Sequence, residues 1–258
     1  MRKKDLAIAL SAMLILAIGV VWGSFLKSSL HCINIFYDQT LDNSYSGGRQ
    51  DSIMLQGLLI YFPEYAQIIR PVESYRSGDL DRCPVNFYIG SYRDNRLPQE
   101  FLQDYVKTKK NVAWIGYNIW QLGENLPKSL GVEFVGITVD DEKRGPAFFR
   151  DIIYKGEIYK RTSLSRKSQV SAPPTEQVIL RPVDLTRTQI LAESKQRSSE
   201  EVIPYIIRTN NYFYIADIPF SYRERSDRYL VFVDLLFDIL GTEVPRKDLF
   251  TLVKQDRQ

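Results

Sequence analysis

The stretch that decides the fold runs from Tyr88 to Leu122, YIGSYRDNRLPQEFLQDYVKTKKNVAWIGYNIWQL. Val85 to Ile89, which overlaps the start of this stretch, is a short apolar and aromatic run that ends at Gly90. Such a run is typical of a buried strand. Pro98 suits the first turn of a helix, which we expect to run to about Thr108. Asn111 to Ile115 then reads as a second buried strand. The pattern predicts a right-handed βαβ unit, in which ligands bind beyond the carboxyl ends of the strands.

Working outward toward the N-terminus, the same alternation of strand and helix continues. Cys32 to Tyr37 predicts a first central strand that ends at Asp38. Asp51 or Ser52 can cap a helix through about Phe62, and Tyr65 to Arg70 reads as another strand. Four strands with intervening helices predict an α/β fold with a parallel, flavodoxin-like sheet.

Beyond Leu122 the pattern changes to short strand-like runs separated by turn residues. We expect these runs to form an antiparallel β extension at the edge of the sheet. They cover residues 132–139, 148–159, 177–180, 189–192, 205–208 and 212–216. A last helix is expected to begin at Ser226 or Asp227 and to stop at Gly241.

The N-terminus predicts a membrane anchor. Leu6 to Leu26 carries no charge, follows Arg2, Lys3 and Lys4, and as a helix is long enough to cross the hydrocarbon layer. A cleaved signal peptide is the competing interpretation, but the apolar run exceeds an ordinary signal core and no small-residue cleavage site follows it. The basic flank predicts a single pass through a bacterial inner membrane with the bulk of the chain extracytoplasmic, or periplasmic.

These features divide the 258 residues into three parts. Residues 1–27 are the basic end and the transmembrane signal anchor, 28–245 are one extracytoplasmic α/β domain, and 246–258 are a C-terminal tail. The formal net charge is +3, from 34 basic and 31 acidic side chains, so no nucleic-acid partner is expected.

Several motifs resemble an uncharacterised bacterial family related to polysaccharide deacetylases. They are Ile89-Gly90-Ser91 with Leu97-Pro98, the run Trp114 to Leu122, Tyr154-Lys155-Gly156, and the run Ala216 to Tyr222. The resemblance covers about Ile33 to Gly241. It implies an α/β domain similar to class I glutamine amidotransferases, which in the family precedes a deacetylase-like domain. That second domain, with its metal-binding part, is expected to be missing, and Lys247 to Asp256 looks like a remnant of its start.

The sequence lacks the residues for the chemistry that these relatives suggest. His31 is the only histidine, so we expect no deacetylase-type metal site and no hydrolytic triad. Gly90-Ser91 stands where an amidotransferase would need its nucleophilic cysteine, so that activity does not carry over. No phosphate-binding glycine loop is present, and no cofactor is expected.

The two cysteines allow a disulfide. If the first and third strands are neighbours, Cys32 and Cys83 fall at the same N-terminal edge of the sheet and can pair in an oxidising compartment. The alternative is two separate buried thiols.

The candidate ligand site is the rim where the strands end, at Asp38, Ser91, Arg93, Asn118, Trp120, Gln121 and Asp217. Amides beside aromatic rings are suited to a sugar or another polyhydroxylated ligand. The structural alternative is that Asn118 caps a helix and Trp120 fills the core. A glycosidic cleavage needs one carboxyl group as acid and one as base, and Asp38 and Asp217 are candidates for these roles, although nothing in the sequence fixes their separation.

The sequence therefore predicts a membrane-anchored, extracytoplasmic, non-catalytic domain that binds or scaffolds in envelope polysaccharide handling. Its expected partners are the membrane, through Leu6 to Leu26, and a polysaccharide ligand or an envelope glycan enzyme such as a deacetylase or synthase. The alternative is a hydrolase that acts on surface glycans through the rim carboxylates. The expected link to polysaccharides rests on the family resemblance alone.

Overall fold

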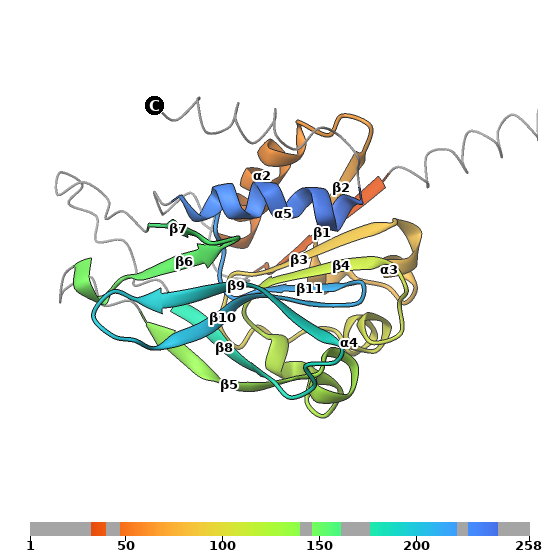
Figure 1. The fold of residues 1–258 in the computed structure, drawn as a ribbon. Helices are drawn as coiled ribbons and strands as arrows, with labels where there is room; N and C mark the ends of the chain where they lie inside the picture. Colours follow the sequence, from red (N-terminus) through yellow and green to blue (C-terminus); the bar gives the residue numbers. More distant parts are fainter. Residues whose placement is uncertain (1–31, 40–46, 140–145, 161–175, 221–226, 242–258) are drawn as a thin grey trace, which may run out of the picture.

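The computed structural model describes residues 32–39, 47–139, 146–160, 176–220 and 227–241. A nine-stranded sheet with the order β2-β1-β3-β4-β11-β10-β9-β6-β7 forms its centre (Figure 1). The first part of the chain supplies β1 (Cys32–Tyr37), α2 (Gly47–Leu59), β2 (Ala66–Pro71), η1 (Val72–Ser74), α3 (Asp79–Arg82), β3 (Val85–Gly90), α4 (Gln99–Tyr105) and β4 (Asn111–Gly116). These strands pair in parallel, as the sequence predicts.

The second part of the chain is mainly antiparallel. Its elements are η2 (Ile119–Leu122), a short π-helical segment η3 (Leu126–Leu130), β5 (Val132–Val139), η5 (Pro146–Phe148), β6 (Arg150–Tyr154), β7 (Glu157–Tyr159), β8 (Glu176–Pro182), β9 (Thr188–Gln196), β10 (Val202–Thr209), β11 (Tyr212–Ile215) and α5 (Arg228–Leu240). Strands β10, β9, β6 and β7 pair antiparallel and extend the sheet.

Two details of the predicted extension are wrong. Strand β11 lies parallel to β4, because the β10–β11 hairpin reverses the chain before it reaches the parallel strands. Strands β5 and β8 do not join the nine-stranded sheet. They pair with each other, antiparallel, and form a separate two-stranded sheet. The parallel core therefore has five strands, and the mixed α/β sheet is consistent with a flavodoxin-like arrangement.

Helix boundaries differ from the prediction in two places. Helix α2 begins at Gly47 instead of Asp51 or Ser52. Its first turn lies against the end of β1, where a side chain on Gly48 would collide with the main chain of Asp38. Helix α4 ends at Tyr105, and the N–H groups of Lys107 and Thr108 both bond to the carbonyl of Asp104 in the turn that follows. Helix α5 ends as predicted, at Gly241 in the left-handed conformation.

The sheet is covered on both faces. Figure 1 shows α5 and α2 above it, and α4 with the β5–β8 pair below it. On the upper face Phe62, which follows α2, packs 5.2 Å from Phe237 of α5, ring centre to ring centre. On the lower face Phe101 of α4 lies between Tyr88 and Trp114, at 5.3 and 5.7 Å. Aromatic pairs of this kind add about 0.5–1.5 kcal/mol each to simple burial.

No helix in the described ranges is long and apolar enough to span a bilayer. The predicted anchor, Leu6 to Leu26, lies outside these ranges, as do His31 and the tail 246–258. The anchor therefore stays a prediction.

Cys32 and Cys83 form a disulfide across the N-terminal edge of the sheet, with their Cα atoms 5.1 Å apart. The geometric condition set by the sequence is met, because β1 and β3 are neighbours and Ile33 pairs with Val85. The bond closes a loop with a sequence separation of 51 residues, which holds the β1–β3 pair together.

Replacing Cys32 and Cys83 together with serine should lower the free energy of unfolding by about 2–4 kcal/mol, since the unfolded chain regains the freedom that the cross-link removes. Chemical denaturation of the wild type with and without dithiothreitol provides the matched comparison. Two reactive thiols in the denatured, unreduced wild type would contradict the assignment.

Candidate functional site

The rim site lies between β1 and β3, where the strand order of the sheet changes direction. From β1 the chain crosses through α2 to the outer strand β2, whereas from β3 it crosses through α4 to β4 on the other side. The two helices therefore cover opposite faces, as Figure 1 shows. A crevice beyond the carboxyl ends of β1 and β3 is the place where open α/β sheets bind ligands.

Asp38 occupies this position directly after β1, and its side chain is fully buried. Its Oδ1 accepts hydrogen bonds from the Tyr88 hydroxyl at 2.6 Å and the Asn95 amide at 2.9 Å. Its Oδ2 accepts from the Tyr92 N–H at 3.1 Å and the Asn118 amide at 3.3 Å. Four donors from β3 and from the loops after β3 and β4 thus meet at one carboxyl group.

Burial raises the pKa of Asp38 to about 7, since an ionised carboxylate is costly to remove from water. The hydrogen bonds from Tyr88, Tyr92 and Asn95 favour the ionised form and oppose that shift, and the charge of Glu73 adds to it slightly. Asp38 therefore changes its charge close to neutral pH.

Two glycines let the loops after β3 and β4 approach each other. A Cβ on Gly90 would lie 2.5 Å from the Tyr117 carbonyl oxygen, and one on Gly116 would lie 2.5 Å from the Gly90 carbonyl oxygen. The Tyr117 N–H donates to that Gly90 carbonyl at 2.9 Å. Gly116 also has φ of 81°, which favours glycine. This contact accounts for the glycine of Ile89-Gly90-Ser91 and for the glycine of the run Trp114 to Leu122.

Asn118 does not cap η2, because its side chain makes no capping hydrogen bond. Its amide group donates instead to the Tyr92 carbonyl at 2.8 Å and to the Tyr88 hydroxyl at 3.2 Å, in addition to Asp38. Its backbone holds a φ of 74°, a conformation that asparagine tolerates better than most residues. Asn118 therefore ties the loop after β4 to the loop after β3.

Ser91, Gln121 and Arg93 lie on the same loops with different roles. The Ser91 hydroxyl donates to Asp51 of α2 at 3.1 Å. Gln121 accepts from the Leu97 N–H at 3.0 Å and donates to the Asn95 carbonyl, so its amide is occupied in holding the β3–α4 loop. The Arg93 side chain is more than half exposed, with the Asp94 carboxylate 3.9 Å away.

Asp217, after β11, belongs to a different cluster. It accepts a hydrogen bond from the Tyr205 hydroxyl and forms an ion pair with Arg228 at the start of α5, and all three side chains are buried. Strands β3 and β4 lie between β1 and β11, and three strand spacings of about 4.8 Å place the ends of β1 and β11 about 14 Å apart. The two carboxyl groups of a glycosidase are only about 5–9.5 Å apart, so the strand order separates Asp38 from Asp217 too widely for an acid–base pair.

Trp120 is partly buried and packs against the hydrophobic core, as the structural alternative expects in part. Its ring lies 5.1 Å from that of Phe134 on β5 and 6.4 Å from that of Tyr117, and the Tyr117 hydroxyl donates to Glu176 at 2.7 Å. Phe134 is 38% exposed, and the other two rings are partly exposed. We call Tyr117, Trp120 and Phe134 the aromatic strip.

Sequence reasoning missed four residues of the site, Glu73, Tyr88, Asn95 and Phe134. Tyr88 could have been predicted, because alternation along the strands places it on the same face of the sheet as Asp38 once β1 and β3 are neighbours. Asn95 and Glu73 join the network through loops, and the Asn95 amide also approaches Glu73 at 3.2 Å. No periodic signal marks loop contacts of this kind.

Within the described ranges no group of three or more His, Cys, Asp or Glu side chains could hold a metal ion.

Comparison with known proteins leaves the family open. No protein-family model matches the chain, and no curated protein matches it. Among solved structures it is similar to exo-beta-1,4-mannosidase Op5Man5 from Opitutaceae bacterium strain TAV5, with 12% identity, a TM-score of 0.48, and 86% of this chain and 36% of that chain covered. The chain thus spans about a third of the mannosidase.

Two smaller proteins are also similar. A ThuA-like protein from Bacteroides uniformis has 13% identity and a TM-score of 0.46, with 79% of this chain and 89% of that chain covered. The Trypanosoma brucei CTPS glutaminase domain has 7% identity and a TM-score of 0.41, with 83% and 95% covered. With TM-scores below 0.5 and identities of 13% or less, these neighbours carry no conclusion about the family or the activity of this chain. None of the three is a polysaccharide deacetylase.

The titration of Asp38 should appear in the pH dependence of stability. Because the pKa is about 3.8 in the unfolded chain and about 7 in the folded one, the folded state holds the extra proton between these values. The unfolding free energy should therefore fall as pH rises from 5 to 7, by up to about 1.4 kcal/mol per pH unit from this group. Denaturation of Asp38→Asn at each pH should show that this part of the slope is lost, and parallel wild-type and variant profiles would refute the assignment.

The Asp217–Arg228 pair should behave as a structural ion pair. Asp217→Asn removes the negative charge that faces a buried guanidinium, so we expect a loss of about 3–5 kcal/mol in unfolding free energy. Glu133→Gln, which breaks the exposed pair with Arg181, is the matched control and should cost about 0–1 kcal/mol. Equal small losses in both variants would show that the buried pair is not structural.

Proposed function

We propose that this chain is a membrane-anchored, extracytoplasmic binding or scaffolding domain in envelope polysaccharide handling, and that it has no catalytic machinery of its own. The aromatic strip is the surface that contacts the sugar. The anchor is the predicted segment Leu6 to Leu26.

The observation that carries the proposal is the state of the two rim carboxylates. Asp38 is 0% exposed and Asp217 is 5% exposed, and each is bound by side chains of the protein itself. A glycosidic cleavage by two carboxyl groups requires both to reach opposite sides of the same bond. Buried carboxylates in separate networks do not offer that arrangement.

The aromatic strip supports sugar binding. Partly exposed rings can cover the apolar face of a pyranose, whereas Asn118 and Gln121, which the sequence suggested as ligand amides, already bond to the protein. The exposed Arg93 lies on the neighbouring loop after β3, where its charge favours an acidic glycan.

The disulfide supports an extracytoplasmic position. Disulfides persist in oxidising compartments and are rare in the cytosol. The Cys32–Cys83 bond stands directly after the predicted membrane segment, at the point where the chain enters the sheet.

The alternative is a hydrolase acting on surface glycans, and one observation favours it. Asp38 has a pKa of about 7, which is the range that suits a general acid or base at neutral pH. A substrate would first have to displace the side chains that bury the Asp38 carboxyl group.

Titration of the detergent-solubilised full chain with envelope polysaccharide, followed by calorimetry, tests the proposal. Trp120→Ala should weaken binding roughly three- to tenfold, because it removes one stacking ring. Ile158→Ala, at an exposed apolar position on β7, is the control and should leave binding unchanged. The same mixtures should contain no released sugar or acetate. Turnover that disappears in Asp38→Asn would establish the hydrolase instead.

A further inference from the structure

The edge of the sheet opposite the rim has a distinct surface of its own. It consists of the loops that lead into β2, β3, β4 and β9, at residues 60–64, 82–84, 107–110 and 183–187. We call this surface the basal edge. It also includes Cys32, the first residue of β1.

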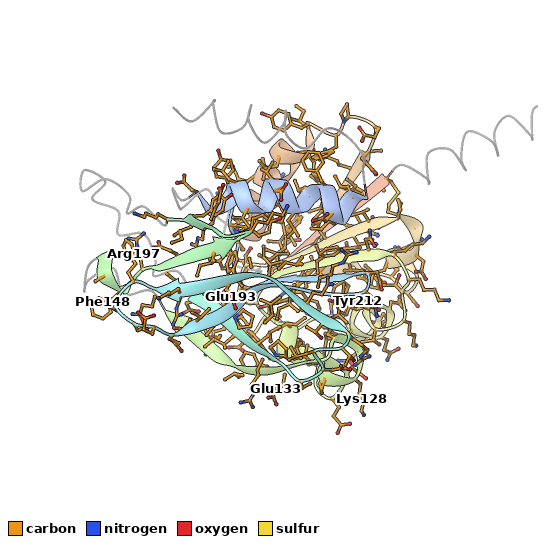
Figure 2. The ribbon with its side chains drawn as sticks, viewed as in Figure 1. Lys128, Glu133, Phe148, Glu193, Arg197 and Tyr212 are labelled. Atoms are coloured by element: carbon orange, nitrogen blue, oxygen red, sulfur yellow. A yellow bond between two sulfur atoms is a disulfide. The ribbon has the colours of Figure 1, made fainter. Side chains whose placement is uncertain are left out.

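Strand register places these loops side by side. Cys32 pairs with Ala66, so the start of β1 lies beside the loop at 60–64. Val85 pairs with Asn111, so the loop at 82–84 lies beside Lys110. Thr188, the first residue of β9, pairs with Thr209, the last residue of β10. In Figure 2 Tyr212, the first residue of β11, and Lys128, near the loop at 183–187, lie toward one side of the molecule, and Arg197 lies at the opposite side.

The basal edge carries a cluster of basic side chains. Lys107, Lys109 and Lys110 are exposed, and no ion pair involves them within the described ranges. Of the acidic groups nearby, Asp184 pairs with Arg187. Asp81, which accepts a hydrogen bond from the Thr108 hydroxyl at 2.7 Å, and the exposed Glu64 are two further acidic groups at this edge. Lys107, Lys109 and Lys110 thus place three positive charges within four residues, at the same edge as the two carboxyl groups of Glu64 and Asp81.

Apolar side chains flank the lysines. Ile60 is 70% exposed and Tyr61 is 42% exposed after α2, and at the other end Leu185 is 74% exposed and Val183 is 51% exposed. Aliphatic and tyrosine side chains next to lysines are the composition that binds at the boundary between lipid head groups and acyl chains.

The position of the chain's entry point matches this composition. Six peptide units separate Leu26, the end of the predicted membrane segment, from Cys32, and they reach at most about 22 Å. With that segment in the bilayer, the basal edge is the side of the domain that the tether holds closest to the membrane.

We propose that the basal edge rests on the anionic phospholipid surface of the membrane that anchors the chain, with Lys107, Lys109 and Lys110 against the head groups and Ile60, Tyr61 and Leu185 at the lipid boundary. The inference rests on the membrane anchor of the proposed function. The contact holds the rim, with its aromatic strip, away from the membrane and toward the envelope.

The test uses the full chain reconstituted into vesicles of phosphatidylcholine alone or with one third phosphatidylglycerol. An amine-reactive reagent is applied outside, and modification of each lysine is read by peptide mass spectrometry. Lys109 and Lys110 should be modified at least about threefold less in the anionic vesicles, and 0.5 M NaCl should abolish the protection, since salt screens surface attraction. Lys195, which pairs with Glu200 near the opposite end of β9, is the internal reference and should not change.

A charge-reversal variant gives a second readout. Lys107→Glu and Lys110→Glu together should leave unfolding unchanged and remove the difference between the two vesicle types at Lys109. Equal modification of Lys109 in both vesicle types would overturn the inference while the anchor stands. Protection that appears only when an acidic polysaccharide is added to neutral vesicles would also overturn it. A chain that fails to float with vesicles after an alkaline wash would refute the anchor itself, and the inference with it.

Discussion

The buried carboxyl group of Asp38 is the constraint on which the rim depends. A carboxylate with no exposed surface is tolerated only when donors surround it, and here Tyr88, Tyr92, Asn95 and Asn118 supply them. These donors come from one strand and from two loops that have no regular structure of their own. The same hydrogen bonds that compensate the buried charge therefore fix the shape of the loops beyond β3 and β4.

The glycine contact and the disulfide hold the two ends of the same strands. Gly90 and Gly116 allow the loops to touch at the carboxyl end, and Cys32–Cys83 joins β1 to β3 at the amino end. Between them the aromatic cluster around Phe101 fills the lower face. The β1–β3–β4 unit is thus fixed at both edges and in its core.

Much of this fold could be predicted from the sequence. Periodicity and the glycine and proline positions placed the parallel strands. With β1 and β3 taken as neighbours, the disulfide was one of two possibilities, the other being two separate buried thiols. The parallel pairing of β11 and the separate β5–β8 sheet could not be predicted, because short antiparallel runs carry no signal of which partner they join. Of the candidate site residues, Asp38 and Asn118 do meet, but as structural partners. The Arg228 partner of Asp217 lies on a helix whose apolar pattern predicts only packing.

The carboxyl groups of Asp38 and Asp217 are buried, whereas the aromatic strip is partly exposed and Lys107, Lys109 and Lys110 are exposed. These carboxylates stabilise loops, whereas the partly exposed aromatic strip and the basal edge face solvent at opposite edges of the sheet. The central claim, that Asp38 is sealed inside the protein, is tested most directly by carbon-detected NMR titration of its side-chain carboxyl group. We predict a midpoint near pH 7 that does not move when polysaccharide is added. A midpoint near 4, the value of a solvated aspartate, or a midpoint that shifts with the glycan, would contradict it.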